Sequence, residues 1–207
     1  MPSTPPPRVL MESVPAHPAF VRLDTIAGVQ VDLRYASNDN VFGRDVYAGF
    51  DCAWVHVDAA AALAAAVAWL HAHAPGERLL VLDALRPHRV QEQLWAALHD
   101  PALRRYLADP ARGSIHSYGL AIDATLLGPD GRELDMGTGF DAMTELSHPA
   151  LEPEHLAAGR LTPAQVAARG RLRDAMAAGG FRGVTHEWWH FDLHDRDVVR
   201  ATGIRVE

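Results

Sequence analysis

The chain has 207 residues, enough for one compact domain that buries its own core without disulfide or metal support. Hydrophobic residues make up 48% and charged residues 22%, which are ordinary globular values and exclude a fibrous or wholly disordered chain. The 19 Lys and Arg against 26 Asp and Glu give a net charge of -7. With a negative net charge, the protein lacks the positive electrostatic field that attracts nucleic acid or an anionic membrane surface, so we expect neither partner.

The cysteine content and the N-terminus indicate a compartment. The single cysteine, Cys52, cannot form an internal disulfide, which suits a reducing environment. The first residues carry three consecutive prolines and lack the charged start and apolar stretch of a secretory signal. The longest apolar run, Ala59–Leu70, is too short for a bilayer, which needs about 20 residues. We expect a cytoplasmic protein in which residues 1–15 are flexible and residues 16–207 form the domain.

The first half of the chain predicts strands and helices in alternation. Val29–Tyr35 alternates apolar and polar residues, as a half-buried strand does. Asp58 is a plausible N-cap for an alanine-rich helix that runs through His71. Arg78–Asp83 predicts a buried strand, and Pro87 suits the first turn of the next helix, where its missing N–H costs nothing.

The second half predicts a hairpin, a long helix and a last strand. Pro101–Ala108 indicates a short helix, and Leu120–Leu127 is a β-rich segment followed by the turn Gly128–Gly131, which suggests an antiparallel hairpin. A helix is bounded by Thr162-Pro163 and Gly179-Gly180, and a strand follows over Trp189–Leu193. Without a regular βαβ rhythm, these elements predict an α+β domain with a largely antiparallel sheet.

The segment His186–His190 matches HExxH, the pattern in which two histidines one helical turn apart bind zinc beside a general-base glutamate. The pattern has this meaning only on a helix. From Trp189 the chain alternates strictly between apolar and polar residues, which favours a strand. On a strand the two histidines could still share a face, but the helical metalloprotease geometry would be lost.

A second candidate metal site lies upstream. Asp123 interrupts an otherwise apolar strand, where a carboxylate costs several kcal/mol unless a cation or good hydrogen bonds compensate. His116 precedes this strand in a loop of small residues, in which Gly119 lets the backbone bend. With His190 from a neighbouring strand, these residues supply three zinc ligands and leave a fourth position open for water. Taken singly, each residue is more often structural: a histidine satisfied by hydrogen bonds, or an aspartate paired with an arginine.

The combination of motifs resembles a known family. The sequence has Ser-x-His followed by Asp over Ser114–Asp123, and Glu-Trp-Trp-His over Glu187–His190. This pair of motifs resembles the zinc D-alanyl-D-alanine dipeptidases. These enzymes are the vancomycin-resistance-type branch of the D-Ala-D-Ala metallopeptidases. The similarity extends to Val31–Ala36, to Asp83–Pro87 with Val90 and Gln91, and to Asp135–Asp141, in the same order, and covers roughly residues 25 to 195. The sequence departs from the family pattern in the loop Asn38–Gly43.

The resemblance implies a fold and a set of roles. The fold would be a single α+β domain of the hedgehog/DD-peptidase-like type, with a central, largely antiparallel sheet flanked by helices. Carried over by position, the resemblance implies one zinc ion per chain with the ligands His116, Asp123 and His190. It also implies Glu187 as the catalytic base and Arg86 as a transition-state stabiliser. For Arg86 the structural alternative is an ion pair with Asp83.

The base assignment poses a geometric problem. Residues three apart on a regular strand point to opposite faces, so Glu187 and His190 cannot converge without a twist, bulge or strand end between them. We therefore predict an irregularity at Trp188. An undistorted strand from Glu187 to His190 would contradict the assignment.

A free dipeptide also presents an ammonium and a carboxylate, and a closed pocket must match each with an opposite charge or a hydrogen bond. Asp141 is the candidate ammonium anchor, Ser114 a candidate hydrogen-bond donor or loop-orienting residue, and Tyr35 a candidate pocket wall. Without a substrate role, Asp141 would cap a turn, Ser114 would form hydrogen bonds with backbone groups, and Tyr35 would cover the core. The remaining histidines, including His148, have no comparable setting.

The function implied by the resemblance is zinc-dependent hydrolysis of the D-Ala-D-Ala dipeptide to free D-alanine. A metal-bound water activated by the glutamate would attack, and the arginine would stabilise the oxyanion. In the cytoplasm this reaction would limit a peptidoglycan precursor or recycle wall-derived dipeptide. The rivals are a D,D-carboxypeptidase or endopeptidase acting on longer cell-wall peptides, and a non-catalytic zinc or peptide-binding module. The expected partner is a small D-amino-acid dipeptide, and association into a homo-oligomer is left open.

Overall fold

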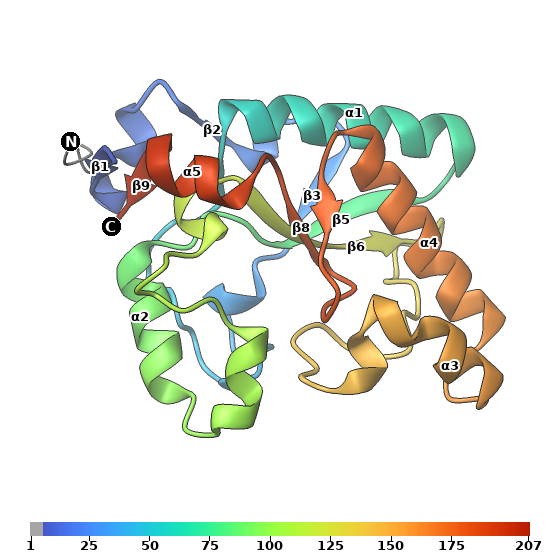
Figure 1. The fold of residues 1–207 in the computed structure, drawn as a ribbon. Coiled ribbons are helices and arrows are strands. Elements are labelled where there is room, and N and C mark those ends of the chain that lie inside the picture. Colours follow the sequence, from blue (N-terminus) through green and yellow to red (C-terminus); the bar gives the residue numbers. More distant parts are fainter. Residues whose placement is uncertain (1–5) are drawn as a thin grey trace.

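The computed structural model describes residues 6–207 as a mixture of helices and strands in one domain (Figure 1). The strands are β1 Arg8–Val9, β2 Phe20–Arg22, β3 Val29–Val31, β4 Trp54–His56, β5 Arg78–Asp83, β6 Ala121–Leu127, β7 Arg182–Gly183, β8 His190–Asp192 and β9 Arg205–Val206. The α-helices are α1 Val57–His73, α2 His88–Ala97, α3 Glu152–Ala157, α4 Pro163–Ala178 and α5 Arg196–Thr202. Short 3-10 helices include η1 Met11–Ala16, η3 Arg34–Ala36, η4 Pro101–Tyr106, η5 Ile115–Tyr118, η6 Glu145–Ser147 and η7 Pro149–Leu151.

The main sheet has the strand order β3-β5-β6-β8-β7. β3 runs parallel to β5, and the other neighbours are antiparallel. Two small sheets pair β2 with β4 antiparallel and β1 with β9 parallel. The α+β class is confirmed, but the expectation of one largely antiparallel central sheet needs correction, because the sheets are mixed. The parallel pair arises because α1 lies in the connection from β3 to β5 and carries the chain back to the end at which β3 began.

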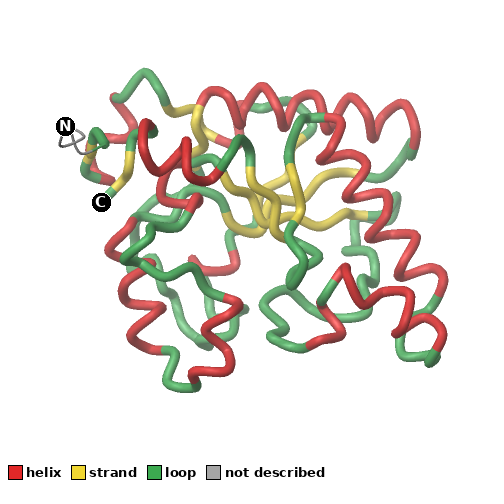
Figure 2. Tube along the Cα trace, viewed as in Figure 1, coloured by secondary structure: helices red, strands yellow, loops and turns green. Residues whose placement is uncertain are grey.

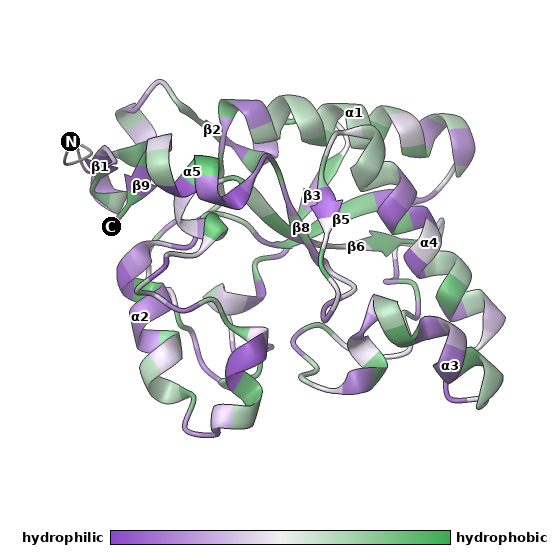
Figure 3. Cartoon of the chain, in the orientation of Figure 1, coloured by the Kyte–Doolittle hydropathy of each residue, from purple (hydrophilic) through white to green (hydrophobic). Residues whose placement is uncertain are grey.

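One side of the main sheet is covered by α1 and α4 (Figure 1). The alanine-rich α1 has small residues on its buried face, which lets neighbouring backbone approach closely. At the end of α4, a Cβ on Gly179 would lie 2.3 Å from the carbonyl oxygen of Ala62 in α1, so only glycine fits there. Figure 3 shows apolar colour over most of α1 and over the central strands β5 and β6, whose residues are almost all buried.

The other side of the sheet carries two lobes (Figure 1). The green lobe contains α2 and η4, and the gold and orange lobe contains η6, η7 and α3. Figure 2 shows that loops and short helices dominate both lobes, whereas the strands lie above them. Side chains from the green lobe and from the segment that leads into the gold lobe line a pocket at this side of the sheet.

The elements largely follow the sequence predictions. The strand over Arg78–Asp83 and the helix bounded by Thr162 and Gly179 form as predicted. The strand predicted over Val29–Tyr35 ends at Val31, because the chain turns into η3. The predicted hairpin after β6 is reduced to a turn and one isolated bridge, Leu127 to Glu133.

The N-terminal segment differs from its prediction. Residues 1–5 lie outside the described residues, but from residue 8 the chain forms β1 and η1 rather than a flexible lead-in. Met11 and Val14 are buried in a cluster that also contains Val206 from the C-terminal strand. These apolar side chains explain the docking, because leaving them in water would cost more than ordering the segment. Within residues 6–207, no helix combines the length and hydropathy that a membrane crossing requires.

Candidate active site

The register of the main sheet brings two of the three proposed ligands together. Asp123 in β6 lies directly opposite His190 in β8. Side chains opposite each other on antiparallel strands share a face and lie within contact distance. The Oδ1 atom of Asp123 is 2.9 Å from Nδ1 of His190. Two residues that are 67 positions apart in the chain therefore form one cross-strand pair.

The third proposed ligand comes from η5, directly before β6. Gly119 ends this short helix in the left-handed conformation, with φ of 65°, and redirects the chain into the strand. This turn places His116 Nε2 3.2 Å from His190 Nδ1 and 3.4 Å from Asp123 Oδ1. The three residues form the one group of metal-binding side chains found among the described residues, with all three ligand atoms within 4.8 Å of one another.

Hydrogen bonds at the outer nitrogens orient both imidazoles. Nδ1 of His116 donates to the carbonyl oxygen of Ala84 at 2.8 Å, which leaves Nε2 as the free lone pair. Nε2 of His190 donates to Asp192 Oδ1 at 2.9 Å, which leaves Nδ1 free. Arg196 in turn binds the other oxygen of Asp192. Such outer partners fix the tautomer and the orientation of metal-binding histidines.

The geometry of these three atoms fits zinc. Ligands at tetrahedral corners about 2.0–2.1 Å from a zinc ion lie about 3.3 Å from one another. The three distances observed between the ligand atoms are 2.9, 3.2 and 3.4 Å. Two imidazoles and one carboxylate are also a donor set that zinc accepts, and three protein ligands leave one position open.

Glu187 approaches the same point because the strand is interrupted, as predicted. Bends at Trp188 and Trp189 precede β8, which begins only at His190, and no helix forms over His186–His190. Oε2 of Glu187 is thereby brought within 4.0 Å of Nδ1 of His190. The Glu187 side chain is 14% exposed, and burial raises the pKa of its carboxyl group to about 8. The helical zinc-protease alternative for HExxH is wrong.

Arg86 is held in a buried network beside this group. Its Nε and Nη2 atoms donate to Oδ2 of Asp83 at 2.9 and 2.5 Å, and Nη1 donates to Oε1 of Gln91 at 2.9 Å. The guanidinium lies 4.8 Å from the ring centre of Tyr35 and 3.6 Å from Asp123 Oδ2. The ion pair with Asp83 thus exists, and it holds Arg86 at the pocket wall.

Asp141 and Tyr35 meet at one end of the pocket. The hydroxyl of Tyr35 donates to Oδ1 of Asp141 at 3.0 Å. Oδ2 of Asp141 is buried and has no hydrogen-bond partner among the described residues. Burial and the nearby charge of Asp123 raise the pKa of Asp141 to about 7. Asp141 also has a positive φ of 59°, an unusual conformation for a residue other than glycine.

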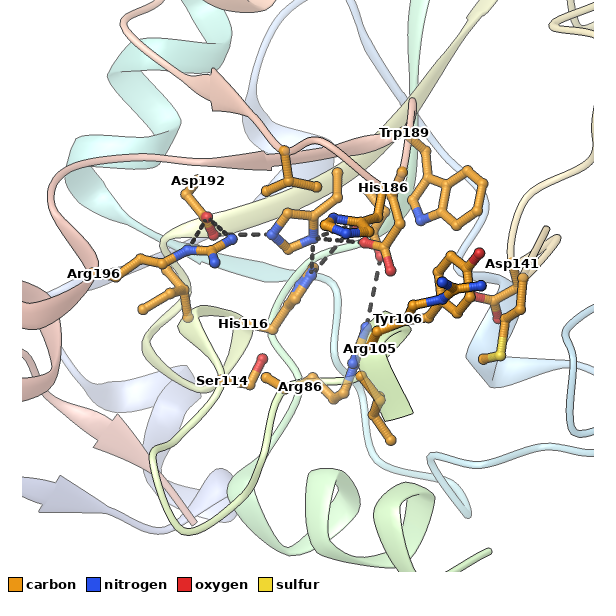
Figure 4. A pocket seen from close by; sticks show the side chains of 18 of the residues that line it. Arg86, Arg105, Tyr106, Ser114, His116, Asp141, His186, Trp189, Asp192 and Arg196 are labelled. Carbon is orange, nitrogen blue, oxygen red and sulfur yellow. Dashed lines mark hydrogen bonds and ion pairs between the residues drawn. The ribbon is translucent and has the colours of Figure 1, made fainter. Parts of the chain in front are cut away.

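All these side chains line one cavity of about 170 Å³. In Figure 4, Asp192 and Arg196 lie at one end of the view and Asp141 at the other, with His116 and Arg86 between them. Ser114 is buried at 3% exposure and also lines the wall. All eight site residues selected from the sequence therefore border the same cavity.

Several residues that support the site were not predicted from the sequence. Asp192 had a detectable signal, because on a strand it shares a face with His190, two residues earlier. Gln91 belongs to a motif that resembles the family, five residues after Arg86, but was given no role. Tyr47 had no signal, since it contacts Asp83 from a segment 36 positions away. In the loop Asn38–Gly43, the side chain of Asn40 donates to three backbone carbonyls and accepts from Phe42, which holds the loop together.

Comparisons with known proteins agree with this geometry. The chain matches the family model described as D-ala-D-ala dipeptidase over residues 17–203. It is 41% identical over 165 residues to a D-alanyl-D-alanine dipeptidase of Escherichia coli (strain K12), covering 80% of this chain and 79% of that protein. It is 35% identical over 193 residues to one of Enterococcus faecalis and 32% identical over 196 residues to one of Streptomyces coelicolor, covering 92% and 91% of those proteins. Because the family model spans nearly the whole chain and these relatives align along most of their lengths, the chain is a peptidase that belongs to the D-Ala-D-Ala dipeptidase family.

Proposed function

We propose that this protein hydrolyses the D-alanyl-D-alanine dipeptide to free D-alanine with one zinc ion held by His116, Asp123 and His190. The observation that carries the proposal is the convergence of His116 Nε2, Asp123 Oδ1 and His190 Nδ1 beside Glu187. Both imidazoles are oriented by outer hydrogen bonds, so their lone pairs face the same point. A purely structural zinc site usually has four protein ligands, and this one has three.

When bound, zinc would polarise the scissile carbonyl and make a coordinated water a better nucleophile. Glu187 takes the proton from the attacking water at Oε2 and passes it to the leaving nitrogen of the second D-alanine. Its partly buried position suits the second step, because a raised pKa helps the carboxyl group to hold the proton until it is transferred.

Arg86 acts on the carbonyl oxygen as negative charge develops on it. Asp83 and Gln91 occupy three of its donor atoms and thereby fix the guanidinium at the pocket wall. Preorganised donors of this kind need no rearrangement during the reaction, and losing one typically costs about 10²–10³ in rate.

The two ends of the dipeptide need matching groups. Asp141 anchors the ammonium, since its Oδ2 is buried without a partner while Tyr35 satisfies Oδ1. An ammonium at this point would supply the missing donor and favour the charged carboxylate. Ser114 offers a hydroxyl on the same cavity wall and contributes a hydrogen bond to the substrate.

The proposal is tested by incubating the purified protein with D-Ala-D-Ala and measuring released D-alanine. We expect a chelator to abolish release and added zinc to restore it. His116→Ala and Glu187→Ala should each abolish release, whereas the exposed His71→Ala at the end of α1 should retain it. Unchanged activity in either site variant would refute the assignment.

The rival substrate class is a longer cell-wall peptide. The family match favours the dipeptide, and comparing turnover of D-Ala-D-Ala with a pentapeptide that ends in the same two residues separates the two. Zinc-dependent dipeptide binding without turnover would indicate a binding module instead. We place the reaction in the cytoplasm, where it would limit or recycle a peptidoglycan precursor.

A further inference from the structure

Two buried side chains from distant segments meet beside the pocket. The hydroxyl of Tyr106, at the end of η4, forms a hydrogen bond with Nε2 of His148 at 2.7 Å. The two residues are 42 positions apart, and they are only 7% and 6% exposed. A short, buried hydrogen bond between distant segments holds those segments together, because neither partner can satisfy itself with water without opening the structure.

A third segment joins this contact. The ring of His186 lies 5.1 Å from the ring of His148 in an edge-to-face arrangement. His186 directly precedes Glu187, and both line the pocket. The guanidinium carbon of Arg105 lies 5.1 Å from the ring centre of Tyr106. The contact is therefore continuous with the segment that carries the proposed base.

The hydrogen bond joins one wall of the cavity to the second lobe, because Tyr106 lines the cavity and His148 lies outside its lining. Residues 105–108 of the green lobe line the cavity together with Asp141 and Met143, which lead into the gold lobe. Figure 4 shows Arg105, Tyr106 and Asp141 at the pocket. Tyr106 belongs to the first lobe, and His148 follows η6 in the second. The cavity that Tyr106 lines has a volume of about 170 Å³.

We propose that the hydrogen bond between Tyr106 and His148 determines substrate length by tying Tyr106, a wall residue of the pocket, to the second lobe, so that a dipeptide fits and a longer peptide does not. This inference rests on the proposed function and extends it to specificity. Neither residue belongs to the proposed metal-binding group, so the pair acts on access and on the space available rather than on the metal.

Substrate preference is the quantity that tests this inference. The ratio of kcat/KM for tri-D-alanine to kcat/KM for D-Ala-D-Ala is measured for the zinc-loaded wild-type protein and its variants. Tyr106→Phe removes only the hydroxyl, and the loss of one hydrogen bond should raise the ratio about two- to tenfold. Tyr106→Ala also removes the ring and should raise the ratio further.

Two further variants separate specificity from general loosening. His148→Gln keeps an acceptor for the Tyr106 hydroxyl and should leave the ratio close to that of the wild-type protein. Tyr118→Phe removes the hydroxyl of another buried tyrosine, one that does not line the cavity, and should leave the ratio unchanged. Thermal unfolding of each variant verifies that it is folded.

An unchanged ratio in folded Tyr106→Phe and Tyr106→Ala would overturn the inference, as would an equal rise in Tyr118→Phe. Binding of the two peptides is also measured by calorimetry in the Glu187→Ala background, where turnover is removed. The relative affinity for the tripeptide should rise when Tyr106 is replaced. This readout distinguishes the two proposals, because lack of dipeptide hydrolysis in the wild-type protein defeats the proposed function, whereas an unaltered binding ratio defeats the inference on length.

Discussion

At the scale of single residues, the site depends on groups that lie behind the proposed ligands. Asp192 holds the outer nitrogen of His190, and Arg196 neutralises the charge of Asp192. The same arrangement appears at Arg86, where Asp83 and Gln91 hold the guanidinium. These partners hold the imidazole and guanidinium groups in one orientation. Catalytic groups that are held in place toward the bond to be cleaved lower the entropic cost of the reaction.

Asp192→Ala should weaken zinc binding about 10- to 100-fold, because His190 loses the acceptor that fixes its tautomer. Competition with a chromophoric chelator measures the affinity directly, without reference to activity. Asp130→Ala is the control, because the exposed Asp130 accepts a backbone hydrogen bond in the turn after β6 and does not line the cavity. An affinity equal to that of the wild-type protein in Asp192→Ala would show that the contact does not orient His190.

Asp141 makes stability depend on pH. Its pKa is about 7 in the folded protein and 3.8 for a free carboxyl group, so the folded state binds the extra proton between these values. Stability contributed by the protonated group is therefore fully present below about pH 4 and is lost as the pH rises to about 7.

Asp141→Asn cannot ionise, so it should unfold at higher urea concentration than the wild-type protein at pH 8. The difference should shrink toward zero at pH 4, and its upper limit at pH 8 is roughly 4 kcal/mol from a shift of about three pKa units. Urea titrations of the metal-free proteins at both pH values measure it. A constant difference across this range would contradict the burial of a charge at Asp141. The variant should also bind the dipeptide more weakly, since it lacks the carboxylate.

At the scale of elements, strand register and one turn assemble the site. The pairing of β6 with β8 aligns Asp123 with His190, and a shift by one residue would place one of them on the opposite face. Gly119 sets the entry into β6 and thereby the position of His116. A Cβ on Gly119 would lie 2.8 Å from the backbone nitrogen of His56, which cannot move easily.

Gly119→Ala should lower the free energy of unfolding by about 1–3 kcal/mol, because it adds a backbone clash to a strained positive φ. It should also weaken zinc binding, since the displaced turn carries His116. Urea unfolding and chelator competition measure the two effects. Gly139→Ala is the control, because nothing lies within 4 Å of its added Cβ. Equal stability of the two variants would show that the turn tolerates a side chain.

At the scale of the whole molecule, the first described strand pairs with the last, and the cavity lies between the green lobe and the segment that leads into the gold lobe. β1 pairs with β9, and the backbone N–H of Met11 donates to the carbonyl oxygen of Glu207. The side chains of Met11 and Val14 are buried and add apolar contacts to this pairing. The N-terminal segment is thus part of the fold rather than an appendage to it.

Met11→Ala should lower the free energy of unfolding by about 2–5 kcal/mol, as truncation of a buried methionine usually does. Leu10→Ala, at a side chain that is 58% exposed, should change it by less than about 0.5 kcal/mol. Chemical unfolding of both variants compares them. Equal, small effects would mean that the segment does not contribute to stability.

The sequence by itself predicted the features that leave a local trace. Alternation after Trp189 identified a strand in place of a zinc-protease helix, and the three-residue spacing of Glu187 and His190 required the bend that the structure has. Spacing and residue type also selected His116, Asp123 and His190, because a carboxylate in an apolar strand needs a compensating partner.

Only the tertiary structure decided the remaining features. Three contacts join segments far apart in the chain. They are the pairing of Tyr106 with His148, the network of Tyr47, Asp83 and Arg86, and the pairing of β1 with β9. Such contacts depend on how loops and lobes pack, and packing leaves no periodic signal in the sequence. The parallel pair of β3 and β5 has the same origin, since the path of the long connection through α1 sets its direction.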